Sequence, residues 1–305
     1  MISVLQRSFR CINYKTHSIS ASFQNSPYLS FLISCVLKIK KMKNVLYIAA
    51  LLLVPLFAIA QTDTIPKTAY IEGNKIRAAV NSNGLLFHDL ETGNGAFTHE
   101  DYPDIPLIKS VGFWAGGIDP SGNLKIAAMQ PSEEGKRDFI PGYIDSETGQ
   151  PKDFNYIASV SRLEIETHRE DLNDNGNVDF PIAAIYSWPG RGNPYFQAYT
   201  GIELPNYDYL APFFDENFDN IYNPDEGDFP ILDVRFNCYE LHAIPAKIIW
   251  TTAHDVTSHN LTNADRVKVT VQPTVFTFNC SKSEISNNTV YVNYIYCFKR
   301  VSFVA

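Results

Sequence analysis

The chain has 305 residues, of which 45% are hydrophobic and 19% charged, with 33 acidic against 25 basic side chains and a formal net charge of −8. A chain of this length can bury a hydrophobic core without a framework of disulfides. Its acidic excess excludes nucleic acid and anionic lipid surfaces as partners, because both contacts need clustered basic side chains to neutralise phosphate.

The first 60 residues have the pattern of an export signal. Lys40, Lys41 and Lys43 precede an apolar run over residues 45–57, which ends at the small-residue sequence Ala58-Ile59-Ala60. This pattern predicts a signal peptide over residues 42–60, cleavage after Ala60 and a secreted or cell-surface protein. A membrane anchor is the alternative, but the run is shorter than the roughly 20 residues that span a bilayer. We therefore expect no stable membrane span after cleavage.

Residues 1–41 contain no Asp or Glu and precede Met42, where the signal would start, so we expect a disordered upstream extension. Residues 61–305 are then a single β-rich secreted domain. Residues 1–60 hold seven of the 25 basic side chains and no acid, which leaves 18 basic and 33 acidic side chains and a net charge of −15. Cations and neutral ligands are the expected small partners.

Three cysteines remain beyond the signal: Cys238, Cys280 and Cys297. An odd number argues against a complete disulfide framework. A single bridge between Cys238 and Cys280 and a set of buried thiols are both compatible with the spacing.

Two β-hairpins are predicted near the start of this domain. Residues 76–80 and 85–90 flank Asn81-Ser82-Asn83-Gly84, whose Asn-Gly pair supplies the positive φ angles of a tight turn. Residues 110–118 and 123–129 flank Asp119-Pro120-Ser121-Gly122, in which Pro presets φ and Gly closes the turn.

Two short helical segments follow. Ser161-Arg162-Leu163-Glu164 matches a capping box, which predicts a helix over residues 165–170. A second helical turn is predicted over residues 181–187, ended by Trp188-Pro189-Gly190.

The last third of the chain is rich in Val, Ile, Thr and Tyr, which predicts strands over residues 246–252, 266–278 and 289–296. Val267, Val269 and Val271 alternate with polar residues in the middle one. The fold class is therefore mainly β: an antiparallel sheet or sandwich with one or two short helices and acidic calcium-type loops.

Residues 215–228 contain six acidic side chains and no Lys or Arg. Oxygen-bearing side chains fall at loop positions 1, 3, 5, 9 and 12, with a backbone carbonyl at position 7, which is the spacing of an EF-hand-type calcium loop. The predicted Ca²⁺ ligands are Asp215, Asn217, Asp219, Ile221, Asn223 and Glu226. The alternative is a solvated acidic turn.

A second candidate loop begins at Asp171. Asp171, Asn173, Asn175 and Asp179 fall at positions 1, 3, 5 and 9, but position 12 is Ile182, which has no carboxylate. Neither loop is flanked by the long amphipathic helices of a calcium sensor. We therefore expect bound Ca²⁺ to fix loop conformation and not to drive an opening switch.

Other constellations are weaker. His254 and His259 lack the spacing of a helical zinc pair and fit a polar loop. Asp153 with Glu164, or Glu203 with Asp208, could serve a glycoside hydrolase, although chance pairs are expected among 33 acids. Aromatic clusters over residues 206–210 and 291–296 could contact carbohydrate or a neighbouring protein, but aromatic residues in a sheet more often form core or cross-strand pairs.

Several motifs in fixed order resemble the amino-terminal region of large, uncharacterised secreted proteins of Bacteroidota that usually end in a type IX secretion sorting domain. The resemblance covers roughly residues 70–296, and its motifs are Asn81-Ser82-Asn83-Gly84, Phe113-Trp114-Ala115-Gly116-Gly117-Ile118-Asp119, Val160 to Glu166, Ser187-Trp188-Pro189-Gly190 and Tyr209 to Pro230. It implies export and calcium, with no activity to transfer. The sorting domain is missing before Ala305, so we expect the domain to be truncated at its carboxyl end.

The leading hypothesis from sequence is a secreted, calcium-stabilised structural or interaction module of surface or adhesion type, without catalytic activity, whose partner is a protein or glycan at the cell surface. The alternative is a secreted glycosidase-like or peptidase-like hydrolase that uses paired acids or the two histidines.

Overall fold

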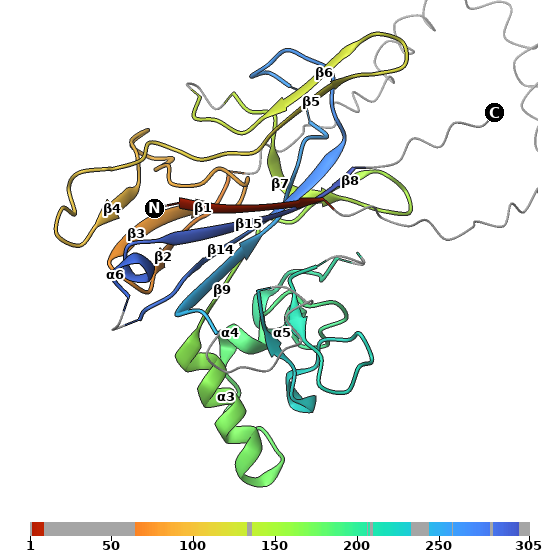
Figure 1. Ribbon diagram of the computed structural model, residues 1–305. Helices are drawn as coiled ribbons and strands as arrows, with labels where there is room; N and C mark the ends of the chain where they lie inside the picture. The colour runs from red at the N-terminus through yellow and green to blue at the C-terminus, as the bar shows by residue number, and fades with distance from the viewer. Residues whose placement is uncertain are drawn as a thin grey trace, which may run out of the picture. The chain divides into compact units, whose positions relative to one another are not determined.

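Strands dominate the fold, as the sequence predicts (Figure 1). The computed structural model describes residues 2–8, 65–132, 136–205, 207, 210–232, 244–257, 259–280 and 283–298. All of them belong to a single compact unit. The fold class, mainly antiparallel β with short helices, is confirmed.

The central element is an eight-stranded sheet in the order β1-β15-β14-β13-β7-β8, with β12 joining β14 to β9. All its pairings are antiparallel except that of β1 with β15. The strands are β1 (Ile2–Ser8), β7 (Ile140–Ile144), β8 (Pro151–Asp153), β9 (Ile157–Ser161), β12 (Lys247–Thr251), β13 (Ala253–His254), β14 (Val269–Thr277) and β15 (Val290–Phe298).

Both faces of this sheet are covered, and every residue of β14 is buried. Val269 and Val271 belong to one hydrophobic core and Phe276 to another. The polar residues that alternate with the valines, Thr270 and Gln272, are only 2% exposed. The alternation in the sequence therefore separates two cores and not a core from solvent. A polar side chain buried in this way needs a hydrogen-bond partner, and the Thr270 hydroxyl accepts the backbone N–H of Ile144 at 2.9 Å.

The first core lies under a three-stranded sheet and a separate hairpin. β2 (Thr68–Glu72), β3 (Ile76–Asn81) and β4 (Phe97–His99) form the sheet, and β5 (Trp114–Ile118) pairs with β6 (Leu124–Ala128) in the hairpin. Ala127 points into this core and is fully buried.

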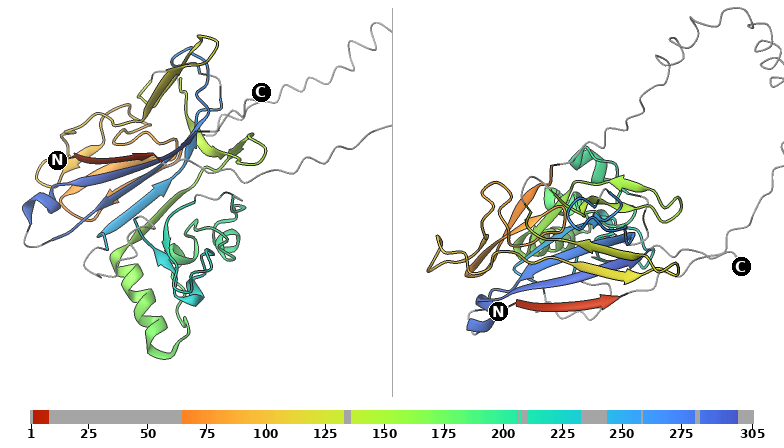
Figure 2. Two further views of the ribbon diagram at one scale, coloured as in Figure 1. Left: turned by 45° about the vertical axis from the view of Figure 1, so that its right-hand side comes forward. Right: turned by 90° about the horizontal axis from the view of Figure 1, so that it is seen from above.

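The second core is rich in aromatic side chains, among them the fully buried Trp188, Trp250 and Tyr222. Around it lie α3 (Arg162–Asn175), α4 (Ala183–Tyr186), α5 (Phe196–Thr200), the 3₁₀ turn η2 (Pro224–Glu226) and the two-residue strands β10 (Phe213–Phe214) and β11 (Phe229–Pro230). Figure 1 and the left view of Figure 2 place these helices on one face of the central sheet and the β5–β6 hairpin on the other.

Most predicted elements are present. The second hairpin forms β5 and β6, the last three strands are β12, β14 and β15, and the turn over residues 181–187 contains α4. The first hairpin is wrong in part: Gly84 makes the turn with φ 86°, but residues 85–90 form only isolated bridges because β3 pairs with β2 and β4 instead.

The helix that starts at Ser161 is longer than predicted. Ser161 accepts the N–H of Glu164 and the Glu164 carboxylate accepts the N–H of Ser161, so the capping box is confirmed. The helix ends at Asn175 because Gly176 adopts the left-handed conformation, φ 82°, and donates its N–H to Leu172.

The amino-terminal segment differs from expectation at one point, since Ile2–Ser8 pairs with β15 as a parallel strand. The edge of β15 offers unpaired backbone groups that an alternating segment can satisfy. The rest of the predicted extension, the signal at residues 42–60, Cys238 and Asp208 lie outside the described residues. Within the described part of the chain, no helix is long and apolar enough to cross a membrane.

Candidate metal centres

The 215–228 loop is closed at its base by two buried aromatic strands. β10 pairs with β11, so that Phe214 lies opposite Phe229 with ring centroids 4.9 Å apart. Both rings belong to the second core. A short ladder therefore presents an otherwise exposed acidic loop from a rigid base.

Backbone N–H groups fold this loop around its first side chain. Asp215 accepts the N–H of Asn220 at 2.8 Å and that of Asp219 at 3.2 Å, and Asp219 accepts the N–H of Ile221 at 2.7 Å. Asn220 adopts φ 61°, the left-handed conformation that an EF-hand loop requires at position 6. The loop thus has the sharp turn that its spacing predicts, with Asn in place of Gly.

The side chains of three predicted ligands are joined by hydrogen bonds. The Asn217 amide nitrogen lies 2.7 Å from the Glu226 carboxylate and 3.3 Å from that of Asp219, and donates to both. Positions 3, 5 and 12 of the loop therefore converge. Among the described residues no Lys or Arg pairs with these carboxylates. The Asn217 amide lies between the carboxylates of Asp219 and Glu226, a position in which a cation would neutralise their charges.

The other two predicted ligands have additional roles. The Asn223 side chain caps η2 by accepting the N–H of Asp225 at 3.2 Å. Ile221, whose predicted ligand is its backbone carbonyl oxygen, is 46% exposed. Asp225, which is absent from the predicted ligand set, accepts hydrogen bonds from the hydroxyl groups of Tyr186 and Tyr195. The hydrogen bond between Tyr195 and Asp225 raises the pKa of Tyr195.

Asp228 is a structural residue of this loop that the spacing argument missed. It is fully buried and accepts the N–H of Glu216 at 2.9 Å and that of Asn223 at 2.8 Å, so it ties the two halves of the loop together. Burial, together with the charges of Asp215 and Asp219, raises its pKa from 3.8 to about 6. The tetrapeptide Asp-Phe-Pro-Ile occurs twice in the chain, at residues 179–182 and 228–231, and this repeat is the signal by which Asp228 could have been found.

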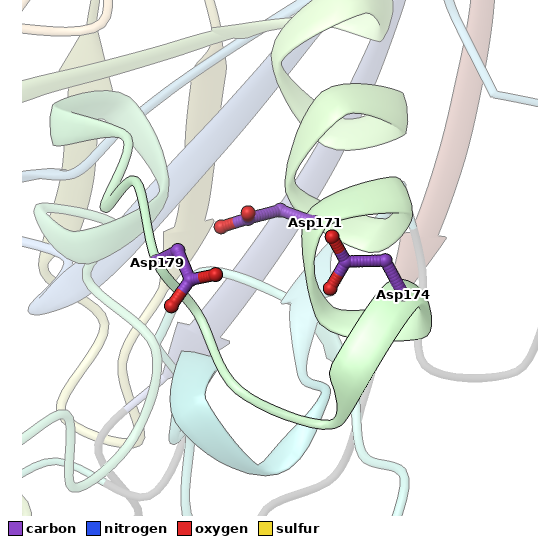
Figure 3. Close-up of side chains that lie close together, drawn as sticks. All are labelled: Asp171, Asp174 and Asp179. Carbon is purple, nitrogen blue, oxygen red and sulfur yellow. The ribbon is translucent and has the colours of Figure 1, made fainter.

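A second group of carboxylates lies at the end of α3. Carboxylate oxygens of Asp171, Asp174 and Asp179 lie within 4.8 Å of one another. Figure 3 shows the first two pointing from the last turns of α3 toward Asp179 on the following loop. Asp171 also accepts the N–H of Phe180 at 2.9 Å, which holds the loop against the helix.

This cluster differs from the predicted loop. Because α3 continues to Asn175, residues at positions 1 and 3 point to different sides of a helix, whereas positions 1 and 4 share a face. The structure brings Asp171 and Asp179 together and adds Asp174. Asn173, two residues after Asp171 in α3, lies on another side of the helix. Asn175 takes part indirectly, because its amide donates to Asp179 at 2.9 Å.

The two acidic segments share a packing surface. A Cβ placed on Gly227 would lie 3.3 Å from the Glu216 side chain and 3.5 Å from Leu172 of α3. The Arg169 guanidinium lies over the Phe229 ring, 4.8 Å from its centroid. The end of the 215–228 loop therefore packs directly on α3.

The residues of the hydrolase alternative are placed differently. His254 is fully buried, and burial lowers its pKa to about 4. His259 is 8% exposed and its ring nitrogens lie 2.8 Å from the carbonyl oxygens of Ile126 and Asp255. The Glu164 carboxylate is used in the capping box. Glu164 and His259 therefore make hydrogen bonds within the fold.

No protein-family model matches the chain, and neither the curated proteins nor the solved structures contain a match.

Proposed function

We propose that this protein is an exported, calcium-stabilised structural or interaction module. The main support is the 215–228 loop, in which Asn217, Asp219 and Glu226 converge while Asp215 holds the turn. Ca²⁺ favours such a set of carboxylate, amide and backbone oxygens. The resemblance to secreted Bacteroidota proteins and the signal pattern at residues 42–60 support export.

The ion would have a structural role in this proposal. The loop joins β10 to β11, and both strands are anchored in the second core. α3 is the only element longer than five residues among the helices that surround that core in the described residues. An ion that replaces the amide between Asp219 and Glu226 would remove carboxylate repulsion and fix the loop, without a pair of helices to open.

A thermal melt with and without Ca²⁺ tests the proposal. At a free Ca²⁺ concentration 100 times Kd, the native state gains about 2.7 kcal/mol. For a domain of this size that gain raises Tm by roughly 5–10 °C. Equal midpoints in Ca²⁺ and in chelator would remove the structural ion.

Variants assign the ion to a loop. Glu226→Gln and Asp219→Asn keep the side-chain shape but remove a charge, so we expect each to reduce the Ca²⁺-induced rise in Tm. Asp104→Asn is the matched control, since Asp104 is exposed and lies outside both acidic segments. A rise that all three variants retain would assign the ion elsewhere.

Metal counting separates the two centres. We expect Asp174→Asn to remove only the Ca²⁺ bound at the end of α3 and Glu226→Gln only the Ca²⁺ bound by the 215–228 loop. Elemental analysis of the purified protein measures the number of bound Ca²⁺ ions per chain.

Mass spectrometry of the same protein determines the mature amino terminus, which we expect at Gln61.

A further inference from the structure

Trp114 is placed unlike the other two tryptophans of the chain. It is 65% exposed at the start of β5, whereas Trp188 and Trp250 are fully buried. A large aromatic side chain that is left in solvent gives up a substantial hydrophobic contribution to folding. Exposed apolar surface marks a recognition site when it forms part of a contiguous patch.

The indole is nevertheless held in a fixed orientation. Its Nε1 donates to the carbonyl oxygen of Met129 at 3.2 Å, and the Met129 N–H donates to Phe113 at 2.9 Å. Gly112 permits this approach, because a Cβ there would lie 2.0 Å from the Met129 oxygen. The ring is therefore a pre-organised platform and loses little conformational freedom when a ligand stacks on it.

An open cleft of about 450 Å³ lies beside this platform. It is lined by Lys109, Ser110, Gly112, Trp114, Met129, Gln130 and Pro131. Three of these side chains supply hydrogen-bonding groups. Among the described residues, Lys109 is the one charged group in the lining, and no described Asp or Glu contributes to it.

A flat aromatic wall next to a few polar side chains fits a ligand with one apolar face and a rim of hydroxyl groups. A pyranose ring has this shape: its axial C–H bonds can lie on the indole, while Ser110, Gln130 and Lys109 exchange hydrogen bonds with its hydroxyls. An apolar peptide would leave the polar groups of the cleft unpaired, which costs affinity.

The same face of the hairpin extends beyond the cleft. Trp114, Gly116 and Ile118 alternate along β5, and the cross-strand neighbour of Ile118 is Leu124. Ile118 and Leu124 are 74% and 56% exposed. The stripe from Trp114 to Ile118 is about 13 Å long at the rise of a β-strand, which is longer than one sugar ring.

We propose that the cleft beside Trp114 binds a pyranose unit of a saccharide chain, with the indole as stacking platform and the β5–β6 stripe as a path for neighbouring units. This inference rests on the proposed interaction role and names its partner class. Lys109 adds a contact to saccharides that carry a carboxylate, so acidic chains bind more tightly than neutral ones.

Tryptophan fluorescence tests the site directly, because Trp114 is the one exposed tryptophan. The full chain is titrated with hexasaccharides of glucose, xylose, mannose, N-acetylglucosamine and galacturonic acid, in the presence of a quencher such as acrylamide. We expect at least one hexasaccharide to protect Trp114 from quenching. Absence of protection by all five would overturn the proposal.

Variants complete the test through the anisotropy of fluorescently labelled hexasaccharides. We expect Trp114→Ala to weaken binding at least tenfold, Lys109→Gln to weaken only the galacturonate ligand, and Tyr102→Ala, an exposed aromatic outside the cleft lining, to leave affinity unchanged. Equal affinity of Trp114→Ala and the parent would overturn the site. Protection of Trp114 that depends on protein concentration alone would identify a protein contact and also overturn it.

The failure of this inference is distinguishable from failure of the proposed function. Trp114→Ala leaves both acidic segments intact, so its Ca²⁺-induced rise in Tm should equal that of the parent. A preserved rise without saccharide binding would reject the glycan site alone.

Discussion

Replacing Asp228 by Asn tests the electrostatic cost that the 215–228 loop imposes on folding, through the pH dependence of stability. Asn keeps the size of the side chain and removes the charge, but its single oxygen can accept only one of the N–H groups of Glu216 and Asn223, a loss that does not depend on pH. Burial raises the pKa of Asp228 from 3.8 to about 6. The native state therefore binds a proton that the unfolded chain releases over this interval.

The sign of the pH dependence follows from that difference. As pH falls through 6, the native carboxyl is protonated before the unfolded one, so the free energy of unfolding of the parent rises. With pKa values of about 6 and 3.8, the gain at pH 5 relative to pH 7 is on the order of 1 kcal/mol.

Urea unfolding of both proteins at pH 7 and pH 5, in calcium-free buffer, measures the effect. Buried histidines act in the opposite direction, because burial lowers the pKa of His254 to about 4, but they act equally in both proteins. We expect the stability of the parent minus that of Asp228→Asn to increase by about 1 kcal/mol on acidification. Parallel pH profiles would refute the reasoning. Saturating Ca²⁺ should shrink the difference, since a cation near the loop stabilises the ionised form.

Three further changes test the packing around the site. Asp255→Ala removes the acceptor of three backbone N–H groups in the buried turn before β14, so we expect a loss of about 3–5 kcal/mol in the free energy of unfolding by urea; a loss below 1 kcal/mol would contradict those bonds. Gly190→Ala places a Cβ 2.5 Å from the Tyr222 ring and should cost about 1–3 kcal/mol, whereas Gly117→Ala meets no atom within 4 Å and should change Tm little. Ser161→Ala removes the cap of α3 and should cost about 1 kcal/mol, measured by calorimetry, with Ser161→Asn retaining most of the stability.

Local rules predicted the elements that local contacts determine. The capping box at Ser161 and the Gly122 turn, with φ 86°, are each satisfied within a few residues of chain, so the sequence contains the whole signal. The turn of the acidic loop is similar, because Asp215 bonds to N–H groups only four and five residues away.

Residues whose roles depend on distant contacts were not predictable in this way. The two Asp-Phe-Pro-Ile repeats have the same local sequence, yet Phe229 is 7% exposed and Phe180 is 78% exposed. Only packing against Phe214 and Arg169 distinguishes them. The segment at residues 85–90 likewise follows an Asn-Gly turn that predicts a hairpin, but β3 pairs with β2 and β4 instead.

The Asp171 segment failed as a loop for a different reason. Its Asn and Asp residues fit the ligand spacing of a calcium loop and the end of a helix equally well. Gly176 fits both structures too, as the glycine at loop position 6 and as the glycine that ends a helix. The capped start at Ser161 decides the competition, because a helix that is already nucleated extends at low cost. Asp174 becomes part of the acidic cluster only through that extension.

The two cores on opposite faces of one sheet divide the molecule into halves with unequal resistance to opening. Both acidic segments belong to the half built on the aromatic core, while Trp114 belongs to the other half. Chelation should therefore loosen a single foldon, seen as faster hydrogen exchange in α3 and β10–β11, while amides of β2, β3 and β5 keep their protection. A recognition surface separated in this way from an ion-dependent half would continue to bind when calcium is scarce.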